Sequence, residues 1–133
     1  MVHVLSSRVL LRPTDPAASR DFYGRVLGLA VQREFETGPG PEDLGTVYFL
    51  GGGHLELSGR AEQPANPGLR LWLQVLDVEA AHRELRERGA RITRPPVREP
   101  WGLVEMWVAA PDEVSLCVVE IPADHPLRYR PAP

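Results

Sequence analysis

Two stretches of the chain, RVLLRPTDPAASRDFYGRVLG (residues 8–28) and RLWLQVLDVEAAHRELRERG (residues 70–89), follow the same plan. Each stretch opens with an arginine, continues as an apolar run typical of a strand, and reaches an aspartate seven residues later. The aspartate then precedes a helical pattern that ends at a glycine. Asp77 follows Asp15 by 62 residues within a chain of 133 residues. A repeat of this kind predicts two copies of one folding unit.

Further strand-like runs follow each expected helix. These runs cover residues 29–36, 45–50 and 53–58 in the first half, and residues 91–98, 101–109 and 114–121 in the second. The order strand, helix, strand, strand, strand therefore occurs twice. This order predicts an α+β fold built from two tandem βαβββ modules.

The repeat also predicts the organisation of the chain. We expect one domain over residues 1–133, with a first module at about 4–58 and a second at about 68–121. A polar segment with two prolines, at about 59–67, is expected to link the modules. The proline-rich tail at about 122–133 has no counterpart in the first half.

Local signals support the expected elements. Asp15 and Asp77 are expected to cap the two helices by accepting hydrogen bonds from backbone amides. Three consecutive glycines at residues 51–53 predict a hairpin turn. The apolar stripe of the first helix is expected at Ala18, Phe22 and Val26.

Composition and charge exclude several classes of function. All 15 basic residues are arginines, so no lysine is present for a Schiff base or for a Walker-type phosphate site. The net charge of −3 and the lack of a basic stripe argue against nucleic acid as a partner. A single cysteine makes no internal disulfide, and we find neither a signal-peptide pattern nor an apolar run long enough to span a membrane. We therefore expect a cytoplasmic protein with no membrane partner.

Five stretches of the chain share the pattern of one known family: the opening strand into Asp15, SRDFYGRVLGL (19–29), LEL (55–57), VLDVEAAHRELRERGA (75–90) and APDEVSLCVVE (110–120). Together they resemble the vicinal oxygen chelate superfamily, which contains glyoxalase I, extradiol dioxygenases, and fosfomycin- and bleomycin-resistance proteins. The last stretch resembles the closing Asp-Pro-Asp-Gly turn of that family, with Ala110 and Glu113 in place of the first aspartate and the glycine. The resemblance reaches to about residue 121. It implies two βαβββ modules whose mixed sheets curl around a cleft, commonly in a homodimer.

The resemblance implies where a divalent metal would bind in the catalytic members. They take one ligand from the first strand and one from the last strand of each module, which corresponds here to Arg8, Glu56, Arg70 and Cys117. Arginine keeps its proton near neutral pH and does not bind a cation. Glu56 is the one conventional ligand for a hard cation, and Cys117 suits zinc better. We therefore expect no metal and no other cofactor, as in the bleomycin-resistance-like branch.

Strand alternation predicts which side chains share the cleft with these four positions. All three tryptophans fall on the expected cleft face, and Tyr48 joins them if its strand keeps its alternation. His54 either forms part of the wall or lies on its strand face without a role. The alternative is that the aromatic side chains belong to the core. The residues that we expect to contact the ligand are Arg8, Leu10, Tyr48, His54, Glu56, Arg70, Trp72, Trp101, Glu105, Trp107 and Cys117.

Two groups in this set have alternative roles. Arg8 and Arg70 either pair with Glu56 or Glu105, or offer their guanidinium groups to an oxygen of the ligand. Cys117 is either a small buried apolar side chain or a nucleophile activated by a neighbouring arginine.

Our leading hypothesis is a small-molecule-binding protein, not an enzyme. It would sequester an aromatic or polycyclic natural product or antibiotic in a metal-free cleft lined by tryptophans, and so confer resistance without altering the drug. Aromatic walls with few polar groups hold flat, partly apolar ligands well. The alternative is a metal-independent lyase, isomerase or biosynthetic enzyme that acts on a small aromatic substrate through His54, Glu56 or Glu105.

Overall fold

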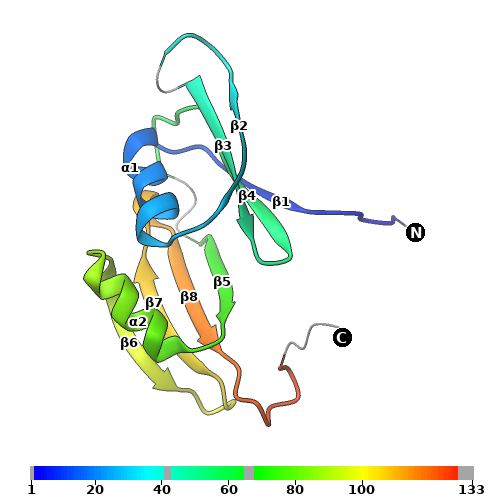
Figure 1. Cartoon of the computed structure of the whole chain (residues 1–133), viewed down its shortest axis with the longest axis vertical. Coiled ribbons are helices and arrows are strands. Elements are labelled where there is room, and N and C mark those ends of the chain that lie inside the picture. Colours follow the sequence, from blue (N-terminus) through cyan, green and yellow to red (C-terminus); the bar gives the residue numbers. More distant parts are fainter. Residues whose placement is uncertain (1, 41–42, 65–67, 129–133) are drawn as a thin grey trace. The chain divides into compact units, whose positions relative to one another are not determined.

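The computed structural model describes residues 2–40, 43–64 and 68–128 of the chain. The chain forms two compact units. Unit 1 comprises Met1–Pro67 together with Pro111–Glu113, and unit 2 comprises Gly68–Ala110 together with Val114–Pro133. Each unit is built on one four-stranded mixed sheet (Figure 1).

Unit 1 contains the first copy of the repeated plan. Its elements are β1 (Arg8–Leu11), α1 (Pro16–Arg20), the π-helical turn η1 (Asp21–Val26), β2 (Val31–Glu36), β3 (Leu44–Leu50) and β4 (Gly53–Leu57). The strand order is β1-β4-β3-β2. Strand β1 pairs with β4 in parallel, and the other two pairs are antiparallel.

Unit 2 repeats the plan. Its elements are β5 (Arg70–Val75), α2 (Val78–Glu87), β6 (Arg91–Arg98), β7 (Val104–Ala109) and β8 (Ser115–Glu120). The strand order is β5-β8-β7-β6, again with a parallel first pair and two antiparallel pairs. The α+β fold of two βαβββ copies, predicted from the sequence, is confirmed.

Both helices begin where the sequence predicts. The Asp15 carboxylate accepts a hydrogen bond from the Ala18 amide at 3.1 Å, and the Asp77 carboxylate accepts one from the Ala80 amide at 3.0 Å. Such caps satisfy amides that have no partner within the helix. Gly28 and Gly89 end the two helical segments with φ values of 78° and 84°, which glycine adopts without steric cost.

Two predicted details are wrong. Phe22 and Val26 are buried as predicted, but Ala18 is exposed, and Ser19 and Tyr23 are buried instead. The cause is η1, because its π-helical turn holds more residues than an α-helical turn and rotates the buried face. In unit 2, the strand expected from residue 101 begins only at Val104, so Trp101 lies on the turn before β7.

Each sheet places an apolar layer on one face. In unit 1 this face carries Leu11, Leu55 and Leu57, and α1 contacts β4. In unit 2, α2 packs against β6, β7 and β8 (Figure 1). The apolar side chains that share one face of the unit 2 sheet and are buried are Leu71, Met106, Val108, Leu116 and Val118. Among the described residues, no helix has the length and apolar character needed to cross a bilayer.

The turn before β8, η3 (Pro111–Glu113), holds two residues in the left-handed region. Asp112 has φ 62° and Glu113 has φ 63°. The Asp112 carboxylate accepts hydrogen bonds from the Thr14 amide and from Thr14 Oγ1, the latter at 2.5 Å. Glu113 is exposed, and it stands where the related turn of the family has glycine.

We predict that Glu113→Gly stabilises the protein by roughly 0.5–1 kcal/mol. The left-handed backbone strains glutamate but not glycine, and the strain removed is larger than the extra conformational entropy that glycine loses on folding. Urea unfolding followed by circular dichroism measures the change. Asp112→Gly is the matched control. It relieves the same strain but removes the hydrogen bonds to Thr14, so it should not stabilise. Equal stabilisation by both variants would contradict this account of the turn.

Candidate ligand-binding site

The face of the unit 1 sheet that lies opposite its apolar layer carries polar residues. In the parallel pairing of β1 with β4, Arg8 is opposite His54 and Leu10 is opposite Glu56, so these four side chains share one face. The sequence predicts this shared face from strand alternation. The His54 ring lies 5.5 Å from the ring of Phe49, which is its cross-strand neighbour on β3.

The Glu56 carboxylate accepts hydrogen bonds from two neighbouring side chains. Arg8 Nη1 donates to Glu56 Oε1 at 2.8 Å, and Ser58 Oγ donates to Glu56 Oε2 at 2.7 Å. The Ser58 hydrogen bond, and then the hydrogen bond and charge of Arg8, hold the pKa of Glu56 below its ordinary value. The structure thus contains the Arg8–Glu56 ion pair, one of the two uses of Arg8 that the sequence leaves open.

Tyr48 does not share this face. It is opposite Leu55 in the β3–β4 pairing, and Leu55 belongs to the apolar layer. Its side chain is 2% exposed, and its hydroxyl lies 3.5 Å from where a Cβ on Gly24 of η1 would stand. Tyr48 therefore faces the helical segment, on the side of the sheet opposite Glu56. The expected grouping of Tyr48 with the tryptophans is wrong because the neighbouring residues Val47 and Phe49 take the other face.

The corresponding face of the unit 2 sheet carries most of the remaining expected site residues. Cys117 on β8 is the register partner of Trp72 on β5 and of Trp107 on β7. The three side chains therefore form a row across adjacent strands, with the small thiol between two indoles. Arg70 and Glu105 lie on the same face, each two residues from a tryptophan of the row.

The tryptophans of unit 2 differ in how much they are exposed. Trp72 is 53% exposed and Trp101 is 58% exposed. Trp107 is half-buried, and the Arg70 guanidinium lies 5.5 Å from the centre of its ring. This is a cation–π contact, which the sequence did not suggest. The buried side chains against which Trp107 packs are Leu103, Cys117, Val119 and Ile121.

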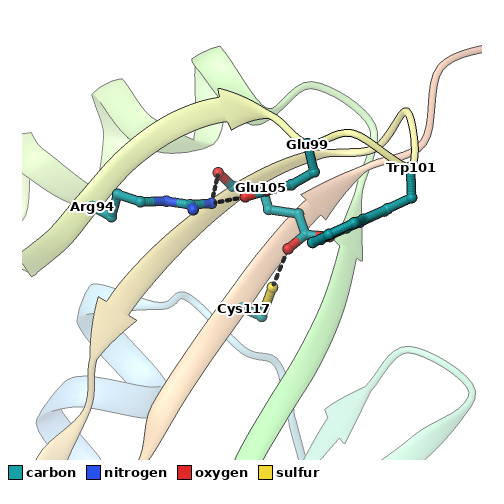
Figure 2. A network of polar contacts seen from close by, with 5 residues as sticks. All are labelled: Arg94, Glu99, Trp101, Glu105 and Cys117. Atoms are coloured by element: carbon teal, nitrogen blue, oxygen red, sulfur yellow. Dashed lines mark hydrogen bonds and ion pairs between the residues drawn. The ribbon is translucent and has the colours of Figure 1, made fainter.

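Glu105 is the centre of a polar network (Figure 2). Trp101 Nε1 donates to Glu105 Oε2 at 2.7 Å, and Cys117 Sγ donates weakly to Glu105 Oε1 at 3.6 Å. Arg94 forms an ion pair with Glu99 at 2.6 Å and donates to the backbone carbonyl of Glu105 at 3.1 Å. Strand alternation does not predict the positions of Arg94 and Glu99, because the β6–β7 register shifts between Arg94 and Val97. The signal for this irregularity is the pair Pro95-Pro96, since proline within a strand marks an edge or a bulge.

Cys117 is not arranged as a nucleophile. Burial, and then the negative charge of Glu105, raise the pKa of the Cys117 thiol to about 12. A nucleophilic cysteine needs the opposite environment, in which a nearby cation or a helix N-terminus stabilises the thiolate. Of the two roles left open by the sequence, the structure favours the small buried side chain.

The residues that correspond to the family's metal ligands do not fit a divalent ion. Arg8 occupies one oxygen of Glu56, Arg70 lies against an indole ring, and Cys117 holds its proton. Among the described residues, no cluster of three or more histidine, cysteine, aspartate or glutamate side chains is placed to bind a metal.

Comparison with known proteins identifies the family. The model of the Glyoxalase/Bleomycin resistance protein/Dioxygenase superfamily matches residues 2–118. The chain belongs to this superfamily. No curated protein matches the chain.

Several solved structures share the fold of this chain. TnmS3, an antibiotic binding protein from Streptomyces sp. CB03234, has a TM-score of 0.72 and 22% identity, over 92% of this chain and 99% of that one. TioX from Micromonospora sp. ML1 has a TM-score of 0.71 and 21% identity, over 86% and 97%. A glyoxalase/bleomycin resistance protein/dioxygenase from Nocardioides has a TM-score of 0.71 and 18% identity, over 98% and 92%.

We predict that Cys117 reacts far more slowly than a free thiol with iodoacetamide, from pH 7 to pH 9, because its pKa of about 12 leaves almost no thiolate. Mass spectrometry of the intact protein over time measures the reaction. The same protein unfolded in guanidinium chloride is the control and should be alkylated at the rate of free glutathione. Equally fast alkylation of the folded protein at pH 8 would show that the thiol is accessible and ionised.

Proposed function

We propose that the protein binds a flat aromatic or polycyclic natural product, such as an antibiotic, and sequesters it unchanged. The observation that carries the proposal is the gathering of Trp72, Trp101 and Trp107 on one face of the unit 2 sheet, with two of them more than half exposed. Exposed aromatic side chains that share a face mark interaction sites more often than isolated ones do.

The arrangement suits a planar ligand. Trp72 and Trp107 stand on strands separated by β8, so their backbones are about 10 Å apart, which is two strand spacings. Cys117 lies between them and is itself buried, so the parts of this row that a ring can reach are the exposed indole of Trp72 and the half-buried indole of Trp107. Each aromatic contact contributes about 0.5–1.5 kcal/mol beyond the burial of apolar area. Three such contacts, together with that burial, are consistent with micromolar affinity, which is about −8 kcal/mol.

Each unit, taken by itself, carries polar groups on its sheet that we propose as further ligand contacts. On the unit 2 face, Arg70 and Glu105 flank the tryptophans. The unit 1 face carries a second set, made up of Arg8, Leu10, His54 and Glu56. Because Arg8 already pairs with Glu56, we propose Arg70 as the guanidinium that is available to an oxygen of the ligand.

Two findings support sequestration rather than metal-dependent catalysis. The described residues offer no fitting set of metal ligands, and Cys117 is protonated. A protein of the same fold, TnmS3, is described as an antibiotic binding protein. A binding protein needs no nucleophile and no metal, so this site can work with the groups that the structure shows.

We predict that Trp72→Ala weakens the binding of an aromatic ligand such as 9-aminoacridine by about tenfold or more, because both the stacking contact and the burial are lost. The exposed Trp72 contributes little to the core, so the melting temperature should stay within a few degrees of the wild-type value. Isothermal titration calorimetry and thermal unfolding measure the two effects. Leu76→Ala, which removes another exposed apolar side chain after β5, is the control and should bind as the wild type does. If Trp72→Ala binds the ligand with wild-type affinity, the tryptophan face is not part of the ligand site.

Sequestration and catalysis differ in the fate of the compound. After incubation with protein treated with EDTA, the compound should be recovered from the denatured complex with its mass unchanged. A new mass that accumulates with time would support the metal-independent enzyme instead. A loss of binding after EDTA treatment, restored by one metal ion, would contradict the metal-free site.

We further propose that the chain acts as a homodimer. Residues 2–7 lie before β1, which is an edge strand, and they carry exposed apolar side chains, of which Leu5 is 96% exposed. Apolar side chains at a free strand edge favour pairing with another chain.

We predict a mass of twice 14.8 kDa in sedimentation equilibrium, and a dimer dissociation constant raised at least tenfold by Leu5→Asp. A mass of 14.8 kDa at every concentration would contradict the dimer. Wild-type association of Leu5→Asp would place the interface elsewhere.

A further inference from the structure

Within the described residues, the carboxylate of Glu105 is buried and forms no ion pair, although the Arg94 guanidinium donates to the backbone carbonyl of the same residue at 3.1 Å. Its residue is 7% exposed, and within residues 2–40, 43–64 and 68–128 no arginine or histidine forms an ion pair with it. The nearby arginines have other partners. Arg94 pairs with Glu99, and Arg70 lies over the ring of Trp107. Glu56, in contrast, has Arg8 at 2.8 Å.

The hydrogen bonds that Glu105 accepts leave acceptor capacity unused. A carboxylate offers about four lone-pair positions, and the Trp101 indole and the Cys117 thiol occupy two of them. A buried charge without a partner is costly unless it is paired. A ligand that brings a cationic donor to this carboxylate would therefore add the ion pair that Glu105 does not form with any described residue.

We propose that the ligand carries a protonated amine next to its aromatic ring, and that Glu105 is the acceptor that selects it. The inference rests on the proposed function, since it names the class of ligand for that same site. Charge-assisted hydrogen bonds to a carboxylate are about twice as strong as neutral ones. The indole faces around Glu105 also attract an ammonium group through cation–π contacts.

The position of Trp101 explains how the amine reaches the carboxylate. The indole lies at Glu105 Oε2 (Figure 2), but it projects from a turn and is 58% exposed. The backbone of that turn is held separately, by bonds from the Glu99 amide to the Leu103 carbonyl and from the Gly102 amide to the Glu99 carbonyl. Rotation of the indole alone therefore uncovers the carboxylate, and the ligand amine replaces the indole N–H as its donor.

Three probes with one naphthalene ring test the inference: 1-naphthylmethylamine, 1-naphthalenemethanol and 1-naphthoate. Calorimetry at pH 7 with the full-length protein should show the amine binding at least tenfold more tightly than the alcohol, and the carboxylate probe most weakly. In Glu105→Gln, the amine and the alcohol should bind within about threefold of each other. Glu87→Gln, which removes an exposed carboxylate from α2, is the control and should keep the wild-type preference.

The outcomes separate the two proposals. If all three probes bind the wild type equally well, the aromatic site stands and the role of Glu105 is overturned. A preference for the amine that survives in folded Glu105→Gln also overturns that role. If none of the probes binds, the proposed function fails, and this inference fails with it. If Glu105→Gln does not fold, which circular dichroism shows, the wild-type comparison of amine with alcohol decides the question.

Discussion

The parallel pairing of the first strand with the last strand of each unit is the constraint on which the site depends. In unit 2 this pairing sets Trp72 of β5 beside Cys117 of β8, and the antiparallel β7–β8 pairing then sets Trp107 on the other side of Cys117. A shift of either register by one residue would turn these side chains toward the opposite face. The helix between the first two strands of each unit makes the parallel pairing possible, because parallel strands need a crossover connection.

The two copies of the fold use corresponding faces differently. In unit 1, Arg8 and Ser58 satisfy the carboxylate of Glu56, so its charge is balanced within the protein. In unit 2, the carboxylate of Glu105 accepts hydrogen bonds from the Trp101 indole and the Cys117 thiol, and it forms no ion pair within the described part of the chain. The same architecture thus holds one carboxylate, Glu56, that is paired with an arginine, and a second, Glu105, that we propose pairs with a cationic ligand.

The sequence predicts the repeat, the helix caps and most of the shared faces, because these depend on local spacing and on the two-residue period of a strand. It fails where the backbone departs from ideal geometry. The π-helical turn buries Ser19 and Tyr23 in place of Ala18, and Tyr48 faces that turn. Arg94 and Glu99 join the site only through an irregular β6–β7 register, and Trp101 reaches Glu105 from a turn where strand alternation does not apply.

The indole N–H signals of the three tryptophans, observed by ¹H–¹⁵N NMR during titration with 9-aminoacridine, test the central claim most directly. All three signals should shift and saturate together, and the Trp101 signal should change most because its hydrogen bond to Glu105 is replaced. Indole signals that stay in place while calorimetry shows the compound to be bound would contradict a ligand site on the tryptophan face of unit 2.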